Sequence, residues 1–250
     1  MSQHPDPVTA YGLTALSAAA SALKPITTSP NTVPADSLAV PETALATRID
    51  AYAKALLPKL TYLHSRRVYS YGVAIASECF PYWKLTPGST LDETWFLAAM
   101  LHDIGTTPEV IKSTRLSYEF WAGLHAMDLL QHPSVSGDKE DAGIAPRDQA
   151  ESVTEAILRH QDVQDKGQVS LVTQLIQLGT LLDNVGAPDA KRLVSDGTIE
   201  VVNKLYDRKG WSGCFRDTVE EEKRLKPWAM VSRIEGFEEM IIANKVTSKE

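Results

Sequence analysis

Apolar residues recur at helical intervals along most of the chain, and this pattern limits the fold more than any other feature. Within residues 61–79, apolar side chains follow His64 four, seven and eleven positions later, which places them on one face of a helix. No stretch keeps the alternation with a period of two that a half-buried strand shows. Further helical patterns cover residues 90–103, 113–130, 148–160 and 170–184, and weaker ones cover 196–206, 211–225 and 234–243. The sequence therefore predicts an all-α fold.

The N-terminal residues 1–44 differ from the rest of the chain. They contain six prolines among many Ser, Thr and Ala residues, a composition typical of loops and linkers. We therefore expect residues 1–44 to form a poorly ordered N-terminal arm and residues 45–250 to form one domain. A mobile linker and an arm docked on the domain both agree with this composition.

Composition argues against several classes of function. The formal net charge of −7, without a basic cluster, disfavours nucleic acid and anionic lipid as partners. No apolar run approaches the roughly 20 residues that cross a bilayer, and the N-terminus lacks the pattern of a secretory signal. Cys79 and Cys214 form neither a disulfide framework nor a CxxC metal motif. We therefore expect a cytoplasmic protein without membrane or nucleic-acid partners.

Five polar side chains occupy positions on the apolar faces of the predicted helices. They are His64, His102, Asp103, His160 and Asp183. A single inward histidine is more often a structural core residue, but a buried carboxylate costs several kcal/mol unless it is paired or bound to a cation. A mixture of imidazoles and carboxylates suits zinc, iron or manganese better than calcium or magnesium, which prefer sites made only of oxygen. The pattern therefore indicates a metal site.

The order of these residues resembles the HD-domain superfamily of metal-dependent hydrolases, which is named for its His-Asp pair. Further segments match one of its families: LHSRRV at 63–68, MLHDIGTT at 100–107, STRLSYE at 113–119, EAILRHQD at 155–162, LDNVG at 182–186, and a late set of Trp211, Cys214-Phe215, Thr218-Val219, Glu222 and Lys226-Pro-Trp228. Together these motifs resemble the fungal cyanamide hydratases over roughly residues 45 to 228.

The resemblance implies an HD-domain helical bundle with one zinc ion per chain, iron or manganese being the less favoured metals. Its ligands would be His64, His102, Asp103 and Asp183. Hydroxide on the metal would add to the nitrile carbon of cyanamide to give urea, which makes the protein a hydro-lyase. Related proteins suggest a homo-oligomer, and the expected partner is a small-molecule substrate.

The same resemblance suggests roles for residues around the metal. We expect His160 to transfer a proton, because its ordinary pKa near 6.5 is close to neutral pH, although metal ligation is a rival role. Thr180 would bind the substrate, or bond only to its own helix. The residues expected near the substrate are Asn184, Glu222, Trp211 and Trp228, and core packing alone also explains the tryptophans.

One segment departs from the family pattern, and two other functions stay open. Residues 229–232 read Ala-Met-Val-Ser, where the family usually carries a His and a Thr, so the physiological substrate is open. One alternative is a metal-dependent hydrolase of a small amide, a nitrile-like compound or a phosphomonoester. No cation follows the His-Asp pair before Lys112, which disfavours a phosphate ester. The other alternative is a non-catalytic HD-fold protein.

Overall fold

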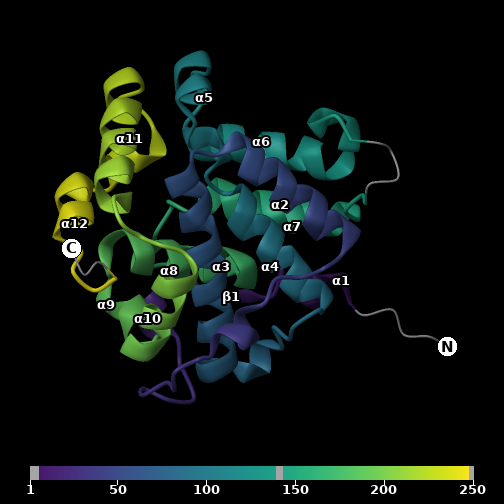
Figure 1. Cartoon of the computed structure of the whole chain (residues 1–250), viewed down its shortest axis with the longest axis vertical. Coiled ribbons are helices and arrows are strands. Elements are labelled where there is room, and N and C mark those ends of the chain that lie inside the picture. The colour runs from purple at the N-terminus through teal and green to yellow at the C-terminus, as the bar shows by residue number, and fades with distance from the viewer. Residues whose placement is uncertain (1–5, 139–142, 248–250) are drawn as a thin grey trace.

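Helices make up almost all the regular structure in the computed structural model, which describes residues 6–138 and 143–247 (Figure 1). The all-α prediction is confirmed, and the described residues add one small antiparallel sheet of two strands, β1 (Ala15–Ser17) and β2 (Gln168–Ser170). The helices are α1 (Pro7–Ala10), α2 (Ala44–Leu56), α3 (Lys59–Cys79), α4 (Thr90–Leu101), α5 (Pro108–Ser113), α6 (Tyr118–Gln131), α7 (Arg147–Arg159), α8 (Leu171–Val185), α9 (Pro188–Lys191), α10 (Asp196–Leu205), α11 (Trp211–Leu225) and α12 (Phe237–Ala243).

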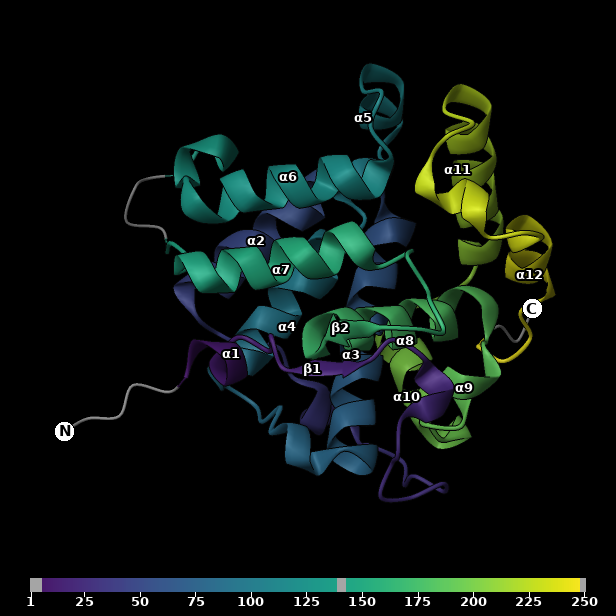
Figure 2. The same ribbon diagram turned by 180° about the vertical axis from the view of Figure 1, so that it is seen from behind.

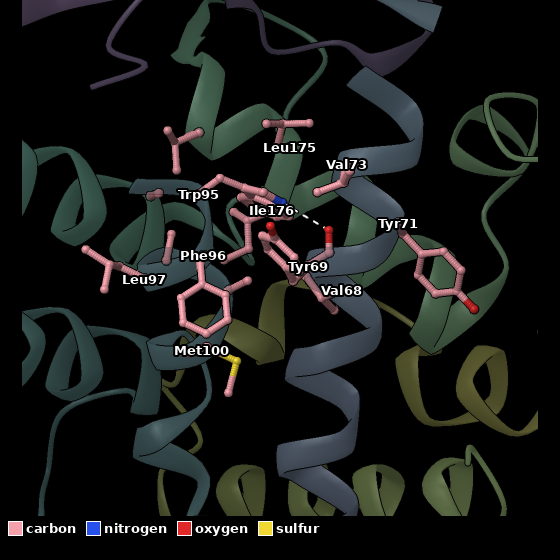
Figure 3. Packing of buried hydrophobic residues seen from close by; sticks show 14 of the residues in the cluster. Val68, Tyr69, Tyr71, Val73, Trp95, Phe96, Leu97, Met100, Leu175 and Ile176 are labelled. Carbon is pink, nitrogen blue, oxygen red and sulfur yellow. Dashed lines mark hydrogen bonds between the residues drawn. The ribbon is translucent and has the colours of Figure 1, made fainter. Parts of the chain in front are cut away.

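The main core lies between α3, α4 and α8. Figure 3 shows Trp95 of α4 beside Tyr69 of α3, and the indole N–H of Trp95 donates to the Tyr69 carbonyl at 3.1 Å. A Cβ atom on Gly72 would lie 2.3 Å from the Trp95 ring, so only glycine allows this approach. The close packing of α3 against α4 brings their polar residues into reach of one another.

Two further groups of helices complete the body. In Figure 2, α6 and α7 lie side by side, while α11 and α12 lie at the opposite side of the molecule from α1. A second hydrophobic cluster joins α11 and α12 to the start of α6; it contains Tyr118, Trp211, Phe215, Val219, Ala229, Val231, Phe237 and Ile241. The end of α7 places His160 beside His102, and the start of α11 places Trp211 against His64.

The N-terminal segment packs against the helical body. Strand β1 pairs with β2 through Leu16 opposite Val169, Leu38 is buried, and the Val33 N–H donates to the Thr198 hydroxyl at 2.9 Å. These are the contacts of a docked arm, one of the two alternatives left by its composition. A docked arm can still open in solution, so its poor order and the boundary at residue 45 stay predictions. Residues 1–5 of the arm lie outside the described part.

Within residues 6–138 and 143–247, no helix is both long enough and apolar enough to cross a membrane.

Candidate metal centre

Two helices bring three of the expected ligands together in the interior. His64 lies on α3, His102 caps the C-terminus of α4, and Asp103 follows it; all three side chains are buried. The Nε2 atoms of His64 and His102 lie 3.2 Å apart. Asp103 Oδ2 lies 3.3 Å from His102 Nε2 and 3.6 Å from His64 Nε2. The structure thus forms a compact group of three donor atoms.

The end of α4 explains how neighbouring residues point to one place. Asp103 leaves the helical conformation with φ −104° and ψ 13°, so its side chain turns toward that of His102. The following turn, Ile104–Thr106, runs close to the start of α6. A Cβ atom on Gly105 would lie 2.2 Å from the Tyr118 carbonyl oxygen, so only glycine allows this approach.

Hydrogen bonds behind the rings fix the tautomers of three histidines. Nδ1 of His102 lies 2.8 Å from the Ala99 carbonyl oxygen, and Nδ1 of His160 lies 2.6 Å from that of Ile157. Because a carbonyl only accepts, both Nδ1 atoms carry the proton. Nδ1 of His64 donates in the same way to the Asp183 carboxylate at 2.6 Å. Each Nε2 therefore presents a lone pair to the interior.

This donor set fits a cation. Among residues 6–138 and 143–247, no hydrogen-bond partner reaches either oxygen of Asp103 or Nε2 of His160, which lies 3.8 Å from Asp103 Oδ1. Lone pairs that face one another without a proton donor repel unless a positive charge lies among them. The three distances of 3.2, 3.3 and 3.6 Å are close to the edge of about 3.3 Å of a tetrahedron with zinc–ligand bonds of about 2 Å. The residues therefore fit a zinc ion.

Electrostatics also favours a positive charge here. Burial raises the pKa of Asp103, but His102, then His64 and His160, lower it more, so it lies well below its usual range. Burial lowers the pKa of His102, yet the nearby Asp103 outweighs this and the net shift is upward. Burial lowers the pKa of His64, with only partial compensation from Asp183. Asp103 thus keeps a buried negative charge that needs a cation beside it.

Asp183 lies behind His64 rather than within the donor group. Its carboxylate accepts from Nδ1 of His64, from Nε and Nη2 of Arg67 at 2.9–3.1 Å, and lies 3.3 Å from Nε of Arg208. Burial raises its pKa, but Arg67 and the His64 hydrogen bond lower it far more. Ligation by Asp183 stays a prediction, and its contacts are those of a carboxylate that orients a histidine ligand.

Comparison with known proteins identifies the family. No protein-family model matches the chain. Two curated proteins of Saccharomyces cerevisiae (strain ATCC 204508 / S288c), Cyanamide hydratase DDI2 and Cyanamide hydratase DDI3, are each 32% identical to it over 205 residues. The matches cover 82% of this chain and 84% of each relative. This chain belongs to the cyanamide hydratase family. Its place in the wider HD superfamily stays a prediction.

Of the two residues with expected catalytic roles in this cyanamide hydratase family member, His160 lies beside the donor group. Nε2 of His160 faces Asp103, and burial, followed by the charge of His102, lowers the pKa of His160 to about 4. Thr180 is buried on α8, where its hydroxyl donates to the Ile176 carbonyl at 2.8 Å. Its proton is therefore used within its own helix, and its oxygen is left to act only as an acceptor.

Two of the four residues expected near the substrate, Trp211 and Asn184, lie beside His64, Trp211 in direct contact and Asn184 through Trp211. The Trp211 ring stacks on His64 with centroids 4.3 Å apart and an angle of 14°. Its indole N–H donates to the side-chain oxygen of Asn184 at 2.9 Å. This pair holds the imidazole of His64 from one face, while Asp183 holds its Nδ1 atom.

The other two residues of that set lie in different surroundings. Glu222 is fully buried and forms an ion pair of 2.7 Å with Lys226. Trp228 is 63% exposed, and its indole N–H donates to the Arg115 carbonyl at 3.0 Å. The structure therefore does not bring Trp228 into the buried group. In the segment that departs from the family pattern, Ala229 and Val231 pack in the second hydrophobic cluster.

Sequence reasoning missed three charged residues near this centre: Arg67, Arg208 and Glu119. Arg67 was detectable, because it lies three residues after His64 and thus on the same helix face. Arg208 comes from the loop before α11, and no local pattern links it to Asp183. Glu119 is buried at the start of α6, where an acidic residue ordinarily indicates only a favourable helix N-terminus.

Proposed function

We propose that this chain is a zinc-dependent hydratase that converts cyanamide into urea. The observation that carries the proposal is the buried group of His64, His102 and Asp103, whose possible ligand atoms all lie within 4.8 Å of one another, with no hydrogen-bond partner for either Asp103 oxygen among the described residues. Membership of the cyanamide hydratase family supports the reaction. We propose the same three residues as the ligands of one zinc ion per chain.

Zinc held there would supply Lewis acidity, which lowers the pKa of a bound water from 15.7 to about 7. The protein supplies the proton acceptor. Nε2 of His160 is buried, lacks a hydrogen-bond partner and carries a lone pair. Because its pKa is lowered to about 4, the imidazole is neutral at pH 7 and ready to accept the proton that leaves the attacking water.

The surroundings suit a small uncharged substrate. The Thr180 hydroxyl donates its hydrogen bond to the Ile176 carbonyl, so its oxygen is left to accept a hydrogen bond from the amino group of cyanamide. The donor residues are almost completely buried, which keeps bulk water from the reacting atoms. Addition to the nitrile carbon releases no leaving group, so the reaction needs only a nucleophile, a proton acceptor and a proton donor.

The buried cations around the centre argue against the phosphomonoester alternative. Arg67 and Arg208 both pair with Asp183, and Lys226 pairs with Glu222. Each thus already contacts a carboxylate, and the two arginines share one. A phosphate dianion would have to compete with these carboxylates, in a protein whose net charge is −7.

The test is urea formation by protein whose metal content has been measured. Wild type should contain close to one zinc per chain and form urea from cyanamide, and His102→Ala should lose both. His132→Ala is the matched control, because His132 lies at the surface, where it pairs with exposed Asp128. Hydrolysis of p-nitrophenyl phosphate without urea formation would replace the proposal with the phosphatase alternative.

A further inference from the structure

Glu119 is a buried carboxyl group without a partner. Its side chain is 0% exposed, and within the described part of the chain no other residue donates a hydrogen bond to either of its oxygens. Burying such a group without compensation costs several kcal/mol in free energy of folding. Proteins keep such groups mainly where function requires them, and the missing partner is then often a ligand.

A set of hydrogen bonds holds the chain just before Glu119. Four consecutive residues are each bonded to the segment that runs from the end of α11 into the following turn. The donors and acceptors are Trp228 Nε1 to Arg115 O at 3.0 Å, Lys226 Nζ to Leu116 O at 2.8 Å, Met230 N to Ser117 Oγ at 3.0 Å, and Tyr118 N to Glu222 Oε1 at 3.0 Å. These bonds fix the start of α6, and with it Glu119.

The start of α6 adjoins the metal centre. The Tyr118 backbone lies against Gly105, two residues after Asp103. The Tyr118 ring centroid is 5.7 Å from that of His160. The charge of Asp103 acts on both Tyr118 and Glu119 and raises the pKa of each. The Glu119 carboxyl therefore lies within electrostatic reach of the donor group.

The surroundings of Glu119 favour the protonated form of its carboxyl group. The net pKa of Glu119 is about 8, and burial is the largest cause of the rise, with smaller increases from the charges of Glu222 and Asp103. The Glu119 backbone N–H and Lys226 act in the opposite direction. Nδ1 of His160 donates to the Ile157 carbonyl, so Nε2 is the atom of this ring that can take up a proton, and Glu119 supplies the acid that acid–base catalysis also needs.

We propose that Glu119 is the proton donor to the nitrile nitrogen, a role that rests on the hydratase function proposed above. In the addition step, the C–O bond forms while one O–H bond of water breaks and its proton passes to His160. The O–H bond of Glu119 breaks, and its proton joins the nitrile nitrogen as one π bond of the C≡N group opens. The neutral adduct is the hydroxy-imine form of urea.

A second exchange restores the enzyme. The hydroxyl proton of the adduct passes to the Glu119 carboxylate, and the proton on His160 passes to the imine nitrogen. The product is urea, and both residues return to their starting states. No further reactant is needed, because water and cyanamide contain all the atoms of urea.

The experiment compares zinc-loaded wild type with Glu119→Gln, which keeps the shape of the side chain but has no proton to transfer. We expect kcat to fall by about a hundredfold or more, with KM and zinc content unchanged. In wild type, kcat should fall at alkaline pH as Glu119 loses its proton. The residual kcat of Glu119→Gln should not fall in this way. Glu119→Asp should recover part of the lost rate. Infrared spectra at pH 7 should show the carbonyl band of a protonated carboxyl group in wild type and not in Glu119→Gln.

Asp92→Asn is the matched control. Asp92 is also a buried carboxyl group, but it bonds to Tyr69 and to the Gly88 N–H and lies ten residues before His102, about 15 Å along the helix. Its variant should keep wild-type kcat. A Glu119→Gln enzyme that forms urea at the wild-type rate refutes the role of Glu119 alone. A wild type that forms no urea refutes the hydratase function, and this role with it.

Discussion

Replacing Lys226 by methionine tests the bonds that fix the start of α6. Lys226 and Glu222 are both 0% exposed and lie 2.7 Å apart, and Lys226 also donates to the Leu116 carbonyl. Methionine fills similar space but removes the charge and the donor. Leaving one member of a buried ion pair without its partner costs about 3–5 kcal/mol. At about 2–4 °C per kcal/mol for a domain of this size, the melting temperature should fall by roughly 6–20 °C.

The loss of stability should depend on pH. Burial already raises the pKa of Glu222, although Lys226 and the Tyr118 N–H act against the rise. Without Lys226 this pKa rises further, so folded Lys226→Met keeps a proton that the unfolded chain releases above pH 4.5. Stability of the variant then declines as pH increases from 4.5 to the raised folded-state value. The difference from wild type should be larger at pH 8 than at pH 5.

Guanidinium denaturation followed by circular dichroism at both pH values measures this difference. The double variant Lys226→Met/Glu222→Gln should recover much of the stability at pH 8, because its buried charge has gone. A loss below about 1 kcal/mol at pH 8, the range of an exposed ion pair, would refute the reasoning. A loss that is equal at both pH values and persists in the double variant would contradict the electrostatic cause.

Three other changes test separate parts of the structure. Gly105→Ala should lower the free energy of unfolding by about 3 kcal/mol, because its Cβ would meet the Tyr118 carbonyl; a denaturation curve that overlays wild type would contradict this close approach. Asp183→Asn should weaken zinc binding by about 10–100-fold in competition with a chromophoric chelator, because His64 loses a charged acceptor; unchanged affinity would show that this carboxylate is dispensable. Leu38→Ala should cost about 2–5 kcal/mol, because the side chain is 2% exposed; a loss near zero would mean that the arm is detached in solution.

The parts of the fold that depend on local sequence were predictable. Apolar periodicity found the main helices, and the side chains expected on their inward faces, including His64, His102 and Asp183, are buried. The convergence of His102 and Asp103 was also predictable, because adjacent side chains meet only where a helix ends. These features depend on spacing along one segment, which a sequence displays directly.

The partners of those side chains were not predictable. Asp183 is on an inward face as expected, but its choice of His64, Arg67 and Arg208 depends on how α3, α8 and the loop before α11 pack. Trp228 carries an apolar ring in a family motif, yet it caps an exposed carbonyl at the surface. Strand β1 forms only because β2 lies opposite. The expected homo-oligomer stays a prediction for the same reason, since its contacts would lie between chains.

Anomalous X-ray diffraction at the zinc absorption edge tests the central claim most directly. From crystals of protein that contains zinc, we predict one anomalous peak per chain, bonded to Nε2 of His64, Nε2 of His102 and a carboxylate oxygen of Asp103. Asp183 should remain bonded to Nδ1 of His64. A map without a peak among these three residues, or with two peaks there, would contradict a single zinc ion held by this group.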